Sequence, residues 1–235
     1  MIKKLKIWFL QLKKLMKPIR ICKICFNEIS FNSCHNFLNQ DLMVCSSCLK
    51  KLNQQFKIFK FYDYDALAIY NYDGLIKEKI FEFKGCGDYE LNNIFIAPFK
   101  NELRILYKNY VIVPAPSFKD NNEKRGYNHV IEMFSFLKLE IVDCLIKTKD
   151  VYQHLSNFKE REKVKNIIEL QTNYNFENKK ILLVDDILTT GSTLKACIDL
   201  LIKKRPKNIK ILVVAKRNFT KEEREKINKN YKIID

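Results

Sequence analysis

The sequence contains no long hydrophobic run, no internal repeat and no low-complexity linker. A helix that crosses a bilayer needs about 20 consecutive apolar residues, and the only apolar stretch near the start, residues 7–10, is too short even for a secretory signal. We therefore expect a cytoplasmic protein, which could also lie at the inner face of the membrane. Because 47% of the residues are hydrophobic and 30% are charged, the chain is neither disordered nor fibrous and can form a compact core.

Acidic residues are few relative to basic ones, at 27 against 43, and the formal net charge is +16. The excess is concentrated in residues 1–60, where 12 basic and 2 acidic side chains give a net charge of +10. Such a charge suggests a polyanionic partner such as nucleic acid, phosphates or acidic lipid. However, Lys outnumbers Arg 36 to 7 and Asn occurs 22 times, a bias that an A/T-rich genome also produces. Charge alone leaves both explanations open.

Residues 1–17 have the pattern of a basic amphipathic helix, which Pro18 ends, and we assign residues 1–19 to this element. Its apolar side chains fall on one face and most of its lysines on the other. Such a helix can lie on an anionic membrane surface or on a nucleic acid, or it can pack on the protein's own body.

Two C-x2-C pairs, Cys22 with Cys25 and Cys45 with Cys48, are separated by 19 residues. This spacing is typical of four thiolates around one structural Zn²⁺, with Zn–S distances of about 2.3 Å. It predicts a small zinc-ribbon-like module over residues 20–60, held together by the metal. The alternatives are a redox dithiol or inert cysteines, and Cys34 and His35 could compete as ligands.

From Lys57 onward, apolar strand patterns alternate with helix patterns, which predicts an α/β domain over residues 61–220 and a basic C-terminal segment over 221–235. Apolar strands separated by helices indicate a parallel sheet covered on both faces. The expected strands are 66–72, 110–114, 181–184 and 209–215, and the expected helices are 75–84, 130–137 and 192–204.

Residues 181–194 form the second strong motif, in which an apolar strand ends in Asp185 and Asp186 and a polar loop opens a helix. Parallel α/β sheets bind ligands at this carboxyl edge. The loop amides, its hydroxyls and the helix N-terminus can surround a phosphate, while the two acids can accept hydrogen bonds from ribose hydroxyls. The alternative is an ordinary capped turn with two solvated acids.

The string V-D-D-I-L-T-T-G-S-T at 184–193 resembles the phosphoribosyl pyrophosphate (PRPP) motif of type I phosphoribosyltransferases. Together with the cysteine pairs, it makes the chain similar to the ComF family of competence-associated proteins over roughly residues 20–217. Further family-like pieces are Y-D-G at 72–74, F-K-G at 83–85, G-D at 87–88, V-P-A-P at 113–116, R-G-Y-N at 125–128 and A-K-R at 215–217. His129 stands where the family usually has Gln, and the family-like loop at 153–166 has shifted intervals and is not mapped residue by residue.

The resemblance implies a type I phosphoribosyltransferase-like sheet that binds PRPP with Mg²⁺. It implies that Asp185 and Asp186 hold the ribose hydroxyls. The 5-phosphate would lie on Thr189, Thr190, Gly191, Ser192 and Thr193, and the pyrophosphate near Pro114, Ala115, Pro116 and Ser117. Departure of pyrophosphate needs cationic help, for which the candidates are Lys84, Arg125 and Arg161, although each could be a surface charge. His35 and His154 have no visible acid or base partner and are assigned no proton transfer.

Two functions follow from these features. The first is a ComF-like competence protein for DNA uptake in natural transformation, which binds single-stranded DNA and PRPP, with a helicase-like ATPase as a partner implied by the resemblance alone. Its DNA-binding candidates are Lys50, Lys51, Lys57 and Lys60, and basic and aromatic residues alternate over 57–62, although aromatics at this spacing are also typical of a core. The alternative is an active phosphoribosyltransferase of nucleobase or nucleotide salvage, for which we find no acceptor-recognition motif.

Overall fold

The structure of the protein is a computed structural model, in which residues 19–29, 42–147 and 168–218 are described. Several predicted features lie outside the described residues: the helix at 1–17, Cys34, His35, the loop at 153–166 with His154 and Arg161, and the segment 221–235. None of the helices within the described ranges combines the length and apolar character that crossing a membrane requires.

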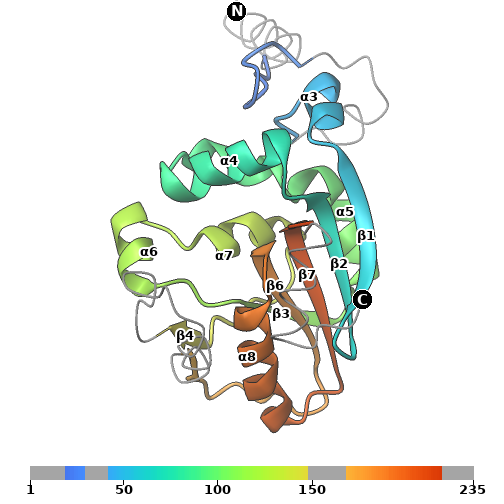
Figure 1. Ribbon diagram of the computed structural model, residues 1–235, viewed down its shortest axis with the longest axis vertical. Coiled ribbons are helices and arrows are strands. Elements are labelled where there is room, and N and C mark those ends of the chain that lie inside the picture. The colour runs from blue at the N-terminus through green and yellow to red at the C-terminus, as the bar shows by residue number, and fades with distance from the viewer. Residues whose placement is uncertain (1–18, 30–41, 148–167, 219–235) are drawn as a thin grey trace, which may run out of the picture.

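The centre of the fold is a five-stranded sheet with the strand order β1-β2-β7-β6-β3 (Figure 1). Its strands are β1 (Gln54–Phe61), β2 (Tyr64–Asn71), β3 (Tyr110–Pro114), β6 (Lys180–Leu188) and β7 (Asn208–Lys216). The four strands β2, β7, β6 and β3 are parallel, and β1 joins the edge as the antiparallel arm of a hairpin with β2. A mostly parallel sheet with flanking helices confirms the expected fold class.

The parallel strands are in register, so their carboxyl ends meet at one edge. Ile181 of β6 lies opposite Val111 of β3 on one side and Ile209 of β7 on the other. These strands are almost entirely buried because they read as continuous apolar runs, which only a sheet covered on both faces accommodates. Polar residues that follow the runs are thereby placed together at the carboxyl edge.

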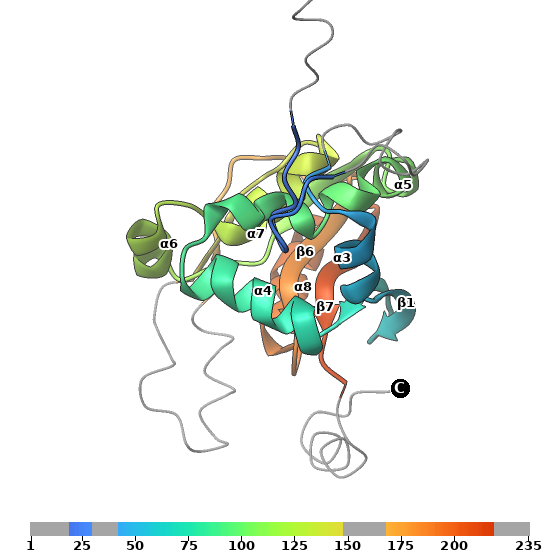
Figure 2. The ribbon, with the colours of Figure 1, turned by 90° about the horizontal axis from the view of Figure 1, so that it is seen from above.

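Helices cover the two faces of the sheet unequally. The α-helices are α3 (Ser46–Lys51), α4 (Gly74–Gly85), α5 (Lys100–Leu106), α6 (Lys119–Arg125), α7 (His129–Phe134) and α8 (Ser192–Leu201). Short 3-10 helices are η1 (Tyr89–Ile94), η2 (Ala97–Phe99), η3 (Ser135–Leu137) and η5 (Ile202–Lys204). One core unites buried residues of α3, α4, α5 and α7, whereas α8 covers the other face alongside the small sheet of β4 (Leu145–Lys147) and β5 (Ile168–Leu170). Figure 2 shows α4 and α7 side by side, with α6 projecting to one side.

Each strand and helix expected from the alternating patterns is present, with bounds that differ by a few residues. The largest extension is that of β6, which continues through Asp185 and Asp186 to Leu188. The expected helices at 130–137 and 192–204 each end in a 3-10 turn, η3 and η5.

Strand β1 was not expected as a strand. Residues 54–60, which the composition assigned to the zinc module, form most of it and belong to the central sheet. Its aromatic side chains favour the core interpretation over a stacking surface for bases, because Phe61 is buried and both Phe59 and Tyr62 are partly buried against the same core as α8. Two apolar side chains of the strand are exposed, Phe56 at 38%, which also contacts the Phe99 ring, and Ile58 at 81%.

Candidate functional site

A pocket of about 270 Å³ lies at the carboxyl edge of the sheet. This volume is just below the range of about 300–1,000 Å³ that is usual for small-molecule sites. Its walls come from α4, the segment after β3, α6, α7, β4, the end of β6 and the start of α8. The lining residues are Lys84, Ala115, Pro116, Ser117, Phe118, Asn121, Arg125, His129, Lys147, Asp185, Asp186, Ile187, Thr189 and Thr193.

The two neighbouring acids of β6 point to opposite faces of the sheet. Successive side chains of a strand alternate between the faces, so Asp186 follows Val184 toward α4 and α7, while Asp185 follows Leu183 toward α8. Asp186 is only 3% exposed. Its Oδ2 accepts from Lys84 Nζ at 2.6 Å and lies 3.0 Å from His129 Nε2, and its Oδ1 accepts from the Ile187 amide at 2.7 Å.

The surroundings push the pKa values of the two acids apart. Burial favours the neutral form of Asp186, but the charge of Lys84 and the hydrogen bond with His129 outweigh it and hold its pKa well below the usual range. Burial, followed by the negative charge of Asp186, raises the pKa of Asp185 well above the usual range. Asp185 is partly exposed to the pocket, and its carboxylate also accepts from the Asp186 amide at 2.9 Å. Asp185 is therefore the acid that is available to a ligand, whereas Asp186 is already engaged.

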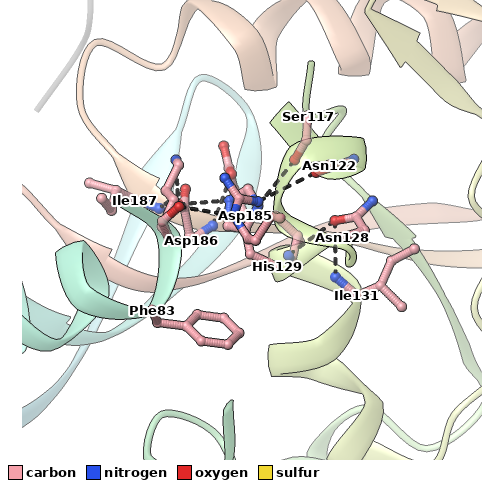
Figure 3. A network of polar contacts seen from close by, with 12 residues as sticks. Phe83, Ser117, Asn122, Asn128, His129, Ile131, Asp185, Asp186 and Ile187 are labelled. Carbon is pink, nitrogen blue, oxygen red and sulfur yellow. Dashed lines mark hydrogen bonds and ion pairs between the residues drawn. The ribbon is translucent and has the colours of Figure 1, made fainter. Parts of the chain in front are cut away.

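His129 links Asp186 to the other wall of the pocket. It is the first residue of α7, whose N-cap Asn128 accepts from the amides of Val130 and Ile131 at 3.1 and 3.4 Å. Its Nδ1 lies 3.0 Å from Arg125 Nη1 and 3.3 Å from Ser117 Oγ. Burial lowers the pKa of His129 despite the opposing effect of Asp186. Figure 3 shows Ser117, His129 and Asp186 joined in this row of contacts.

The turn after α6 attaches Arg125 to α4. Gly126 ends the helix with φ +83°, a left-handed conformation that glycine adopts without strain. Arg125 Nε donates to the Lys84 carbonyl at 2.9 Å, and Tyr127 Oη donates to the Phe83 carbonyl at 2.6 Å. Two cations, Lys84 and Arg125, are thus held side by side at the pocket.

The loop before α8 is shaped by a glycine. Gly191, the N-cap of α8, has φ +75°, and a Cβ placed on it would lie 2.4 Å from Cε2 of Phe61. No other residue type fits without moving the aromatic ring or the loop. The hydroxyls of Thr190 and Ser192 lie 3.2 Å apart across this turn.

We expect Gly191→Ala to destabilise the protein by roughly 1–3 kcal/mol, because it combines left-handed backbone strain with a clash against Phe61. Urea denaturation of the variant checks this expectation. Gly87→Ala is the matched control, since Gly87 has the same φ of +75° with nothing within 4 Å of its added Cβ. Equal losses in the two variants would show that the contact with Phe61 is unimportant.

The structure brings together most of the residues that the motifs singled out. Asp185, Asp186, Thr189 and Thr193 line the pocket, as do Ala115, Pro116, Ser117, Lys84 and Arg125. Pro114, Thr190, Gly191 and Ser192 are not among its lining residues. Sequence reasoning missed Phe118, Asn121 and Lys147 as pocket residues, and their positions carry no motif that could have identified them. His129 had a signal, since it departs from the family pattern.

The four cysteines of the two C-x2-C pairs gather in one cluster, with all four sulfurs within 4.8 Å of one another. The Cys25 and Cys45 sulfurs are 3.8 Å apart, close to the separation of about 3.8 Å expected for thiolates in a tetrahedron around Zn²⁺. Two amides of the second cysteine pair point at sulfur: Cys45 N donates to Cys22 Sγ and Cys48 N donates to Cys45 Sγ, both at 3.4 Å. The donor set and its spacing fit a metal such as zinc.

The cysteine cluster is joined to the rest of the protein. Cys22, Cys48 and Leu49 are buried in the same core as Phe83 of α4, and Lys23 pairs with Glu90 of η1. A hydrogen bond with the Asn27 backbone lowers the pKa of Cys25 to about 7, whereas burial raises that of Cys48. A bound cation would favour the thiolate form of all four cysteines.

The four DNA-binding candidates lie along α3 and β1. Lys50 and Lys51 occupy the last turn of α3, where a cation also stabilises the helix dipole. Lys57 and Lys60 lie on the edge strand β1, and Lys60 Nζ contacts Asp65 Oδ1 at 2.6 Å. All four side chains are exposed.

Comparisons with known proteins agree with the motifs. The phosphoribosyl transferase domain family matches residues 137–235, which include β6, α8 and β7. The competence protein ComFC of Bacillus subtilis (strain 168) is 31% identical over 139 residues, or 58% of this chain and 58% of that protein. The competence protein ComFC of Streptococcus pneumoniae (strain ATCC BAA-255 / R6) is 28% identical over 190 residues, or 80% of this chain and 83% of that protein. This chain thus spans little more than half the length of the Bacillus relative.

Among solved structures, a hypoxanthine phosphoribosyltransferase from Staphylococcus aureus aligns with a TM-score of 0.37 and 14% identity. The alignment covers 56% of this chain and 68% of that one.

Proposed function

Because the chain belongs to the ComF family of phosphoribosyltransferase-like proteins, we propose that its carboxyl-edge pocket binds PRPP together with Mg²⁺. One observation carries the proposal. The pocket combines a partly exposed acid, Asp185, with two cations, Lys84 and Arg125, and with the hydroxyl-rich loop that opens α8. A sugar that bears both vicinal hydroxyls and phosphates has the complementary chemistry.

Each part of PRPP has complementary residues in the wall of the pocket. Asp185 accepts hydrogen bonds from ribose hydroxyls, and Thr189 and Thr193 with the amides of the α8 N-terminus surround the 5-phosphate. Lys84 and Arg125 face the pyrophosphate and stabilise the charge that develops as it departs.

Mg²⁺ would arrive with the ligand and neutralise the phosphate charge. Within the described residues, only the four cysteines form a cluster of three or more metal-ligating side chains, so the pocket has no ready-made metal cage. This fits Mg²⁺, which usually takes its ligands from substrate phosphates, water and one or two carboxylates.

We further propose that the protein acts in the cytoplasm in natural transformation, where it binds single-stranded DNA and works with a helicase-like ATPase. The names of its relatives support a competence role. The net charge of +10 over residues 1–60 and the exposed lysines of α3 and β1 support DNA binding. In this proposal residues 20–52 supply a structural Zn²⁺ module, and the domain that follows, with β1 as its first strand, binds PRPP.

Calorimetry of the purified protein with PRPP, with and without Mg²⁺, tests the pocket. We expect binding that strengthens with Mg²⁺ and that ribose 5-phosphate or pyrophosphate alone reproduces only weakly. Absence of binding at millimolar PRPP would overturn the proposal. Release of pyrophosphate when nucleobases are added would instead support a salvage enzyme.

We expect single-stranded DNA to bind with little sequence preference and to lose affinity steeply as salt rises. Replacing Lys50, Lys51, Lys57 and Lys60 with Gln should lower the slope of log affinity against log salt by about 0.7 for each DNA phosphate that these lysines neutralise in the parent protein. Fluorescence anisotropy over a salt series measures the slope, and PRPP binding should survive.

The control variant replaces Lys179, Lys203, Lys204 and Lys207 with Gln. These four lysines are also exposed and carry the same charge, but they precede β6 and β7 at the amino ends of the parallel strands and do not belong to α3 or β1. Equal effects of the two quadruple variants would mean that net charge alone drives binding. A loss confined to the control variant would place the DNA at the segments that precede β6 and β7.

A further inference from the structure

Both ring nitrogens of His129 are engaged, although its side chain is almost completely buried. The residue is 3% exposed. Nε2 faces Asp186 Oδ2 at 3.0 Å, and Nδ1 faces Arg125 Nη1 at 3.0 Å and Ser117 Oγ at 3.3 Å. The ring therefore touches the end of β6, the C-terminal residue of α6 and the segment after β3 at once (Figure 3).

The partners determine where the ring carries its proton. A guanidinium can only donate hydrogen bonds, so Nδ1 must accept from Arg125 and cannot itself be protonated. Asp186 is an ionised acceptor, since Lys84 Nζ lies 2.6 Å from the same oxygen, so Nε2 must donate. His129 is thus a neutral imidazole with its hydrogen on Nε2. Arg125 donates a hydrogen bond to His129, and His129 donates one to Asp186.

The same contacts fix how Arg125 faces the pocket. Its Nε donates to the Lys84 carbonyl at 2.9 Å, and Nη1 approaches both His129 and, at 3.4 Å, Asn122 Oδ1. Within the described part of the chain these contacts use Nε and Nη1 and leave the second terminal nitrogen, Nη2, for a ligand. A side chain with little remaining rotational freedom loses little entropy when an anion binds.

We propose that His129 is a positioning residue that holds Arg125 in the orientation in which it receives the pyrophosphate group of the ligand. The proposal deepens the proposed function and rests on the pocket being a pyrophosphate site. The role needs one donor and one acceptor at opposite ends of a planar group, one for Asp186 and one for Arg125. A glutamine amide supplies both, so His129→Gln can preserve the connection, whereas His129→Leu removes it at similar bulk.

The first measurement needs no ligand. We expect ¹⁵N NMR of the ligand-free protein to show His129 as the neutral tautomer with hydrogen on Nε2, and its ring signals to move in Arg125→Lys. A ring that is protonated on Nδ1 would overturn the inference, whether or not PRPP binds.

The second measurement is calorimetry with inorganic pyrophosphate and Mg²⁺. We expect His129→Leu to weaken binding about tenfold or more and His129→Gln to restore most of that loss. Arg125→Ala should weaken binding about as much in the parent but less than twofold in the His129→Leu background, because the arginine is no longer held in place there.

Thermal unfolding of each variant separates positioning from stability. If His129 had only a structural role, its replacement by Leu would lower the melting temperature. The affinity losses of His129→Leu and Arg125→Ala would then multiply in the double variant, and such independent effects would overturn the inference. If the parent protein binds neither pyrophosphate nor PRPP, the proposed function fails and the role of His129 in holding that ligand's arginine fails with it. The NMR result then still decides the hydrogen-bond arrangement.

Discussion

Asp185→Ala is expected to weaken PRPP binding at least tenfold while leaving the stability of the protein nearly unchanged. A charge-assisted hydrogen bond contributes about 1.5–3 kcal/mol, and about 1.4 kcal/mol corresponds to a factor of ten. The stability should hold because Asp185 is partly exposed and its ionised form is disfavoured by burial and by Asp186, so its removal relieves a repulsion. Calorimetry with PRPP and Mg²⁺ gives the affinity, and urea denaturation gives the stability.

Asp186→Ala is the informative comparison, because this acid is engaged with Lys84 and His129. Its loss should reduce the free energy of unfolding by about 1–3 kcal/mol, the cost of a buried partner left unpaired. Lys84 is 42% exposed at its side chain and can be rehydrated, so the loss should stay below that of a fully buried ion pair. PRPP affinity should fall as well, since both cations of the pocket lose their anchor. If both variants lost affinity equally and kept full stability, the two acids would be equivalent ribose ligands.

Removal of the metal is expected to have the largest effect on stability. We expect one Zn²⁺ per chain, and its loss in Cys22→Ser or on chelation should unfold residues 20–52. Structural zinc contributes about 10–16 kcal/mol in isolated zinc-finger peptides. Because Cys22, Cys48 and Leu49 share a core with Phe83 of α4, the effect should extend to α4 and lower the melting temperature of the whole protein.

Metal analysis and hydrogen exchange measure these effects. Cys86→Ser is the matched control, because Cys86 is exposed and lies outside the cysteine cluster, and it should change neither metal content nor stability. Freshly purified, reduced protein without zinc would contradict the prediction. Chelation that exposes residues 20–52 while α4 keeps its protection would show that the cysteine module folds independently of the sheet.

The sequence predicted the four parallel strands, the helices α4, α7 and α8 and the place of the pocket, but not β1, the small β4–β5 sheet or the helices α3, α5 and α6. Apolar runs such as 181–184 are local patterns, and a buried parallel strand needs little else. The motif after this strand had to lie at the carboxyl edge, because parallel strands end together. The spacing of the cysteine pairs was likewise sufficient to predict their cluster, since four thiolates around one metal need only two short turns.

Local sequence patterns did not predict strand β1. Its side chains alternate between exposed and at least partly buried only over the last four residues, 58–61, because the strand carries a bulge between Gln54 and Lys57 and lies at the sheet edge. In the sequence, its basic and aromatic residues therefore resembled a surface that binds single-stranded DNA. Packing against α8 decided that Phe61 belongs to the core and that only glycine fits at position 191.

The sequence by itself determined that Asp185 and Asp186 lie at the ligand edge of a parallel sheet, and it treated them as an equivalent pair. Only the tertiary structure separated them. The partners of Asp186 are Lys84 and His129, which are 102 and 57 residues away in the chain. The periodicity of the sequence predicts which face of the sheet a side chain occupies. The residues that contact it on that face come from distant segments, because α4 and α7 pack on the sheet. For that reason the difference between the partly exposed Asp185 and the buried Asp186, which Lys84 and His129 engage, became visible only in the folded chain.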